Sequence, residues 1–246
     1  MRAINALIGR GAWCAWGALL LATAAQAAPY HLRYEPTETF PEGDGWERLF
    51  SDPDGTTARS TDAGAFELDT SGSISSFDTY LSPAGALSLD LGEELRVSWR
   101  MQTVANTRSN GRSDISVLVL APNRTYTEIF LGVDFVSADE PPGGVVEHNV
   151  PLVPGQPNDF HLVSHDFDTY SFFVGETFAF SGRFSGEALA AGGRIAWGDT
   201  LIGAASHSVW SYVDVSVIPE PSSLTVVVAS IGVGAIVRRR NICDRL

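Results

Sequence analysis

The chain of 246 residues has two cysteines and no lysine. Cys14 lies in an apolar stretch near the start, and Cys243 follows a cluster of arginines near the end. The long part between them has no cysteine, so it can form neither a disulfide framework nor a thiolate metal site. A hydrophobic core must hold it together, which is feasible for one domain of this size.

Basic residues are scarce, and arginine supplies all 16 of them against 29 acids. Between Ala28 and Ile218, ten arginines stand against twenty-seven acids, a net charge of −17 compared with −13 for the whole chain. Such an excess repels nucleic acid and anionic membranes, so neither is an expected partner. It suits a soluble surface domain, or a domain that binds cations.

Catalytic motifs are also missing. His148, His161 and His165 are accompanied by neither a Gly-x-Ser-x-Gly elbow nor a His-Glu-x-x-His pair. An isolated histidine on a strand usually has a structural role. We therefore expect that the protein is not an enzyme.

The N-terminus carries an export signal. Two arginines precede an apolar stretch from Gly11 to Ala22, and small residues stand at Ala25 and Ala27, the positions that a signal peptidase reads. The pattern predicts a secretory signal peptide over residues 1–27. Cleavage after Ala27 leaves a mature chain that begins at Ala28.

The C-terminus carries a short uncharged run, LTVVVASIGVGAIV, from Leu224 to Val237. Fourteen helical residues rise about 21 Å, less than the roughly 30 Å of a hydrocarbon core, so a permanent anchor would be marginal. Two prolines and one glutamate precede the run and three arginines follow it, namely Pro219, Glu220, Pro221, Arg238, Arg239 and Arg240. The arginines are expected on the cytoplasmic side, which puts the preceding chain across the membrane.

This order of a Pro-Glu-Pro tripeptide, a glycine-containing apolar segment and an arginine cluster resembles the PEP-CTERM sorting tail of Gram-negative bacteria. The resemblance covers residues 218–246 and implies export across the inner membrane, recognition by the membrane enzyme exosortase, and a place at the cell surface or in the extracellular matrix. The closing NICDRL is a little longer than usual. A plain C-terminal transmembrane anchor is the alternative, and the short apolar run argues against it.

Strands are predicted throughout residues 28–217. Leu95, Val97, Trp99 and Met101 alternate with polar residues, the period-two pattern of a half-buried strand. Similar runs recur about every ten residues, divided by Gly, Pro, Asn and Asp, and no helical stripe of useful length occurs. The pattern predicts a single all-β domain, an antiparallel β-sandwich or jelly roll.

The second half resembles concanavalin A-like lectin and laminin G-like jelly rolls, over roughly Leu95 to Val217. The residues that carry this resemblance are Phe160, His161, Gly175, Trp197, Gly198, Asp199, Trp210 and Tyr212. It implies a jelly-roll fold and the binding of extracellular polysaccharide. Gly175 is followed by glutamate where many relatives have Asp-Gly, a change that concerns only the turn type.

Glycoside hydrolases with this fold include laminarinase-type enzymes that carry Glu-x-Asp-x-x-Glu on one strand. Here the nearest string, Glu67-Leu68-Asp69, continues with Thr70, Ser71 and Gly72, so the third acid is missing. We therefore expect a non-catalytic polysaccharide-binding module. A structural or adhesive surface protein without a specific ligand is the alternative, and a degenerate glycoside hydrolase ranks third.

Three places are candidates for binding. Sugars stack on exposed aromatic rings, and the alternation near the C-terminus offers Trp210 and Tyr212 on the face opposite Val213. Asp199 ends a strand, where it caps a loop or helps to bind a ligand or cation. Asp52 and Asp54 resemble part of a calcium loop, although a surface Asp-Pro-Asp-Gly turn explains the same string without an ion. No other cofactor is expected.

Overall fold

The computed structural model describes residues 30–62, 64–90, 92–106, 112–140, 144–186, 192–200 and 205–219. The predicted signal peptide, its cleavage site between Ala27 and Ala28, the apolar run 224–237, Glu220, Pro221 and the arginines 238–240 lie outside these residues. Within them, no helix is long and apolar enough to cross a membrane.

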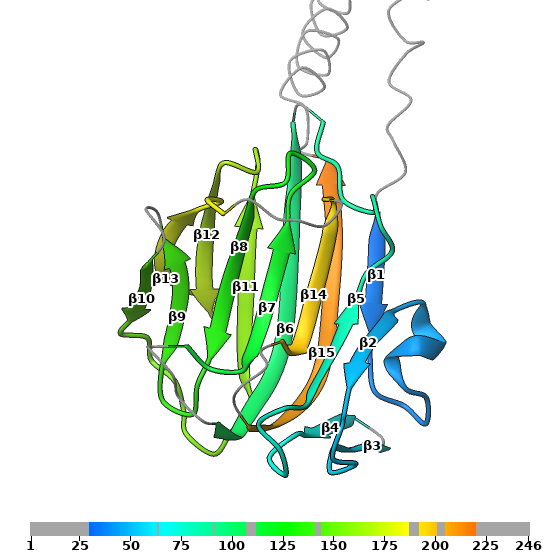
Figure 1. The fold of residues 1–246 in the computed structure, drawn as a ribbon. Helices are drawn as coiled ribbons and strands as arrows, with labels where there is room; N and C mark the ends of the chain where they lie inside the picture. Colours follow the sequence, from blue (N-terminus) through cyan, green and yellow to red (C-terminus); the bar gives the residue numbers. More distant parts are fainter. Residues whose placement is uncertain are drawn as a thin grey trace, which may run out of the picture.

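The described chain forms two antiparallel sheets packed face to face (Figure 1). One has seven strands in the order β10-β9-β8-β7-β14-β5-β2. Its strands are β2 (Glu47–Ser51), β5 (Phe77–Leu81), β7 (Ile115–Leu120), β8 (Tyr126–Leu131), β9 (Val136–Glu140), β10 (Gly144–His148) and β14 (Arg194–Asp199).

The other sheet has eight strands, with the order β13-β12-β11-β6-β15-β4-β3 and with β1 paired to β15. Its strands are β1 (His31–Tyr34), β3 (Ala58–Asp62), β4 (Ala65–Asp69), β6 (Glu93–Asn106), β11 (Asn158–Ser164), β12 (Thr169–Val174), β13 (Thr177–Arg183) and β15 (Ser206–Pro219). A 3-10 turn, η1 (Pro41–Asp44), precedes β2. The predicted all-β, antiparallel, two-layer sandwich is confirmed.

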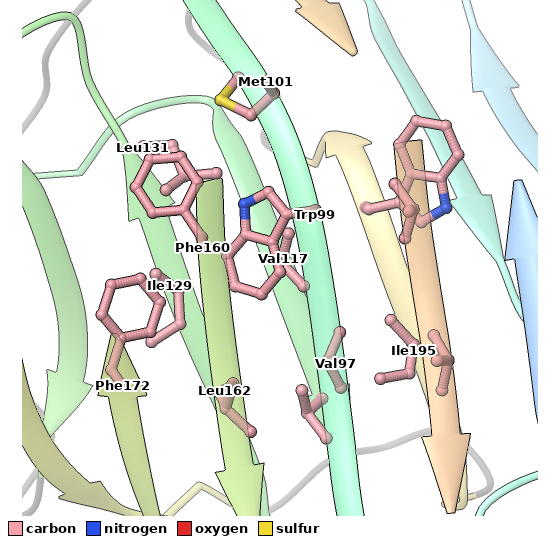
Figure 2. Close-up of a cluster of buried hydrophobic side chains, with 14 of the residues drawn as sticks. Val97, Trp99, Met101, Val117, Ile129, Leu131, Phe160, Leu162, Phe172 and Ile195 are labelled. Atoms are coloured by element: carbon pink, nitrogen blue, oxygen red, sulfur yellow. The ribbon is translucent and has the colours of Figure 1, made fainter. Parts of the chain in front are cut away.

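Strand alternation places the core between the sheets as expected. Trp99 of β6 is fully buried, and its ring centroid lies 5.7 Å from that of Phe160 on β11. Figure 2 shows Trp99, Phe160 and Phe172 from the eight-stranded sheet meeting Val117 and Ile129 from the other. Burial of these large apolar side chains is the main stabilising contribution in a chain without disulfides.

A second aromatic cluster surrounds Trp197 of β14. Its ring stacks on Tyr80 with centroids 4.9 Å apart and lies 5.6 Å from the centroid of Trp46. Trp210 of the opposite sheet lies 4.9 Å away. The cluster joins the two sheets near the edge formed by β2 and β5.

A β-bulge in β15 corrects one expectation from the sequence. Trp210 pairs with Met101 and Tyr212 with Arg100, so Ser211 is an extra residue in the ladder. The bulge turns Trp210 into the core, where it is 0% exposed, while Tyr212 stays on the outer face. Trp210 therefore shares a face with Val213, contrary to the prediction from simple alternation.

Candidate functional site

Trp210 does not provide an exposed surface for a sugar. Its ring is enclosed in the core, and its indole Nε1 donates a hydrogen bond to Ser208 Oγ at 2.9 Å. The bulge that hides it leaves only Tyr212 of the two predicted stacking residues at the surface.

Tyr212 is half-buried on the outer face of the eight-stranded sheet. Its hydroxyl donates to Asp159 Oδ1 at 3.2 Å, and the guanidinium carbon of Arg33 lies 5.6 Å from the ring centroid. Burial and the charge of Asp159 raise the pKa of Tyr212 to about 12. Both the ring and the hydroxyl are thus engaged by neighbouring side chains.

The Asp-Pro-Asp-Gly segment forms a turn that its own carboxylates stabilise. Asp52 Oδ1 and Oδ2 accept hydrogen bonds from the backbone nitrogens of Thr56 and Thr57, both at 3.0 Å. Asp54 Oδ2 accepts from Ser73 Oγ at 2.5 Å. Gly55 has a φ of 66°, which favours glycine at this position. The turn explains the sequence without a cation.

Asp199 is the last residue of β14 and is 0% exposed. Its Oδ2 accepts hydrogen bonds from Thr70 Oγ1 and, at 3.1 Å, from Ser206 Oγ. It is therefore placed inside the sandwich, away from any surface on which a polysaccharide would lie.

A group of polar side chains that the sequence did not single out lies on the outer face of the seven-stranded sheet. The pairing of Ile129 with Ala138 extends to put Glu128 of β8 directly opposite Asp139 of β9, both pointing away from the core. We call this group the Glu128 face; its members are Arg112, Ser116, Tyr126, Glu128, Asp139 and Thr200.

Glu128 is anchored through one carboxylate oxygen. Ser116 Oγ donates to Glu128 Oε1 at 2.6 Å, and Thr200 Oγ1 donates to the same oxygen at 3.1 Å. Burial raises the pKa of Glu128, while these two hydrogen bonds oppose the shift. The two hydroxyl groups thus fix the orientation of a desolvated carboxyl group.

Asp139 and Arg112 form the other half of this face. Arg112 Nη2 lies 2.8 Å from Asp139 Oδ1, and its guanidinium carbon lies 5.3 Å from the ring centroid of the buried Phe130. The same charges reach Tyr126, whose pKa is raised first by burial and then by Asp139 and Glu128. The four side chains therefore form one electrostatic unit.

Hydrogen-bonding capacity remains on this face. In the part of the chain that the structure describes, Glu128 Oε2, Asp139 Oδ2 and the hydroxyl of Tyr126 accept or donate no hydrogen bond. Arg112, Tyr126 and Glu128 are partly exposed, and Asp139 behind them is 8% exposed. A donor, acceptors and an aromatic ring are thus gathered at one place, a combination suited to a ligand rich in hydroxyl groups. Only the strand register, which the sequence does not show, brings these residues together.

A shallow hollow of 390 Å³ lies elsewhere, over β11, β12 and β13. His165, Ser181 and Arg183 are among its lining residues. Across the described ranges, no group of three or more His, Cys, Asp or Glu side chains is arranged to hold a metal ion. The Glu128 face is therefore the stronger candidate for ligand binding.

Comparison with known proteins supports the fold. No family model and no curated protein matches the sequence. A carbohydrate esterase from the Shiga toxin-encoding bacteriophage phi24B has a similar structure, with 9% identity, a TM-score of 0.57, and coverage of 76% of this chain and 97% of that one.

Two further structures are more distant. A protein of unknown function from Shewanella oneidensis MR-1 has 9% identity and a TM-score of 0.49, over 90% of this chain and 98% of that one. The binding domain of botulinum neurotoxin DC, in complex with rat synaptotagmin II, has 9% identity and a TM-score of 0.49, over 77% and 48%. At these identities the likeness concerns the β-sandwich alone.

Proposed function

We propose that this chain is an exported protein of the cell surface or extracellular matrix, and that its sandwich is a non-catalytic polysaccharide-binding module of the concanavalin A-like jelly-roll type. The observation that carries the proposal is the Glu128 face, where Glu128, Asp139 and Tyr126 each keep a polar atom without a hydrogen-bond partner among the described residues. Export rests on the predicted signal peptide, and sorting by an exosortase rests on the PEP-CTERM resemblance.

The chemistry of this face matches that of a sugar chain. Each sugar hydroxyl both donates and accepts, so it pairs with the carboxylate oxygens and with the Arg112 guanidinium, whose side chain is 40% exposed. Tyr126 is half-buried and adds an aromatic surface at the same site. Existing hydrogen bonds already hold Glu128, which lowers the entropy lost on binding.

The same pair of carboxyl groups favours one alternative, a weak or degenerate glycoside hydrolase. Residues directly opposite on adjacent strands have Cβ atoms about 5 Å apart, and retaining hydrolases hold their two carboxyl groups roughly 5 to 5.5 Å apart. However, Asp139 is ion-paired with Arg112, and Glu128 is held by two hydroxyl donors. We therefore assign binding to the pair, and an assay for released reducing sugar distinguishes the two functions.

The test is a glycan array with the purified protein, followed by titration of the polysaccharide that gives the strongest signal. Glu128→Gln and Tyr126→Ala should each weaken binding about ten-fold or more, because each removes a contact at the site centre. Glu38→Gln is the matched control, since Glu38 is exposed in the loop before η1. Unchanged affinity in both site variants would remove the Glu128 face from the proposal.

Absence of any glycan signal would instead favour the structural or adhesive protein without a specific ligand. Release of reducing ends by the unmodified chain, lost in Glu128→Gln, would favour the hydrolase. The proposed module requires saturable binding without turnover. The two site variants must weaken this binding, and the control must leave it unchanged.

A further inference from the structure

The hollow of 390 Å³ lies where β11, β12 and β13 run side by side in the eight-stranded sheet (Figure 1). Across β12 and β13, Thr169 pairs with Arg183 and Ser171 pairs with Ser181. Ser171 pairs on its other side with Val163 of β11. Directly opposite residues point to the same side of a sheet, and so do residues two apart on one strand, so all five share one face. Ligand pockets typically measure roughly 300 to 1,000 Å³, so the hollow can hold part of a sugar chain.

The shared face is the outer face of the sheet. Phe172 and Phe180, which alternate with these residues on β12 and β13, are buried in the core, and their rings stack with centroids 4.8 Å apart. On the other side, Ser181 and Arg183 are exposed and Ser171 is half-buried. The hollow is therefore open to solvent, on the opposite side of the sandwich from the Glu128 face.

Arg183 differs from most arginines of the chain because it has no acid partner. Seven of the nine arginines in the described ranges form an ion pair with an aspartate or a glutamate. Arg124 and Arg183 form none with an acid of those ranges. Acid partners are abundant, since twenty-seven acids stand against ten arginines between Ala28 and Ile218. An arginine that stays unpaired beside a hollow in such a protein has its charge available for a ligand.

Two hydroxyl groups in the same hollow are also available. Neither Ser171 Oγ nor Ser181 Oγ forms a hydrogen bond with the part of the chain that the structure describes. A guanidinium fork and hydroxyl donors are groups that bind a carboxylate or a sulfate. Val163 adds an apolar surface beside these donors. The hollow thus combines a permanent positive charge with neutral donors.

The acids near the hollow are engaged by other groups. Asp166 Oδ1, in the turn between β11 and β12, accepts hydrogen bonds from the backbone nitrogens of Asp168 and Thr169 at 2.8 and 2.9 Å. Glu94 Oε2 lies 4.0 Å from Nε2 of His165. Neither Asp166 nor Glu94 lines the hollow, and His165, which does, is charged only when protonated. Arg183 therefore supplies the permanent charge at this place.

We propose that Arg183, Ser171 and Ser181 form a second binding site, which takes the anionic groups of an acidic polysaccharide. The carboxylate of a uronic acid and a sulfate ester each offer oxygens that accept two parallel hydrogen bonds from a guanidinium. The net charge of the domain repels polyanions, so such a ligand binds only where local donors engage it. The choice of a polysaccharide as carrier rests on the proposed function, whereas the anion site rests on the hollow and its donors.

The test titrates the full chain with a hexamer of galacturonic acid in a calorimeter. The fully methyl-esterified hexamer has the same sugar backbone without the charge, and it should bind about ten-fold more weakly or less. A sulfated maltohexaose distinguishes the two sources of the anion, and tighter binding of either anionic sugar agrees with the site. A hexamer of glutamate should bind more weakly than both, and tighter binding of this peptide would overturn the polysaccharide as the ligand.

Three variants locate the binding. Arg183→Gln should weaken binding of the galacturonate hexamer about ten-fold or more, because it removes the charged fork. Ser181→Tyr should weaken it as well, since the larger side chain fills the hollow. Arg124→Gln is the matched control, because Arg124 is likewise exposed and unpaired in the described ranges, but lies between β7 and β8, away from the hollow.

Equal weakening by Arg183→Gln and Arg124→Gln would reduce the effect to net charge and overturn the site. Full affinity in Ser181→Tyr, or no binding of either anionic sugar to the unmodified chain, would overturn it equally. Glu128→Gln should leave galacturonate binding unchanged, because Glu128 lies on the opposite face, and loss of binding in that variant would place the anion there instead. Galacturonate binding that depends on Arg183, without any binding at the Glu128 face, would remove that face from the proposed function and keep this site.

Discussion

Arg48 donates two hydrogen bonds to the fully buried carboxylate of Asp78, from Nε to Oδ1 at 2.8 Å and from Nη2 to Oδ2 at 2.6 Å. The guanidinium carbon also lies 3.8 Å from the ring centroid of Phe50. Burial raises the pKa of Asp78, and Arg48 opposes that shift. The pair ties the edge strand β2 to β5.

Arg48→Met should therefore lower the free energy of unfolding by about 3 to 5 kcal/mol, because it leaves the charge of Asp78 buried and uncompensated. Unfolding in urea, followed by tryptophan fluorescence, measures the change. The double variant with Asp78→Asn should recover a large part of the loss, since the buried charge is gone. Equal stability of the single and double variants would show that the pair is not coupled.

Glu128→Gln should change how stability depends on pH. The pKa of Glu128 is raised in the folded state, so the folded chain holds this proton at pH values where the unfolded chain has lost it. The contribution of this group to stability therefore falls as pH rises from the unfolded pKa, about 4.3, through the folded one. Glutamine stays neutral and avoids that loss.

Consequently, the Tm of Glu128→Gln should rise relative to that of the unmodified chain as pH increases from about 4. Above the folded-state pKa of Glu128, the difference should level off. Calorimetry across this range checks it, with Glu38→Gln as the control. A difference that moves the opposite way would contradict the raised pKa. A variant that is more stable yet binds polysaccharide less well is typical of a residue kept for function.

Trp210 and Tyr212 should respond very differently to substitution. Trp210→Ala removes a fully buried ring and should cost about 3 to 5 kcal/mol of unfolding free energy. Tyr212→Phe removes one hydrogen bond to Asp159 and should cost about 1 kcal/mol or less. Urea unfolding of both variants tests this, and comparable losses would contradict the assignment of the two faces.

The same two residues show where the alternation of polar and apolar residues fails to predict which side chains are buried. Period-two alternation correctly placed Trp99 in the core, because β6 runs there without interruption. In β15 the extra Ser211 shifts the alternation, and no local signal marks a bulge between Trp210 and Tyr212. The fold class was thus predictable, whereas the orientation of individual side chains near the bulge was not.

The Glu128 face was missed for a different reason. Glu128 and Asp139 belong to separate strands, and only their register makes them neighbours. Catalytic and metal motifs are recognisable when spacing along one element brings their residues together, and here the pairing of strands does so instead.

The C-terminal residues 218–246 are expected to be processed during export. β15 continues to Pro219, which pairs with Glu93, so the Pro-Glu-Pro tripeptide starts where the ladder with β6 ends. If this tripeptide is read by an exosortase, Glu220→Ala should block processing, and the mature protein should keep its C-terminal peptide. If residues 224–237 only anchor the chain, Glu220 lies outside the hydrocarbon, and its replacement should leave membrane retention nearly unchanged.

A charge placed at Val228 or Ile231 should disrupt both modes, because it costs roughly 2.5 to 3.5 kcal/mol near the centre of a membrane helix. These variants therefore serve as the positive control for membrane engagement, and Glu220→Ala carries the distinction. The measurement is the mass of the mature protein from a host that contains an exosortase. An N-terminus at Ala28 reports signal-peptide removal in the same spectrum. Full-length tails in both the unmodified chain and Glu220→Ala would defeat the sorting hypothesis, since processing would then not occur at all.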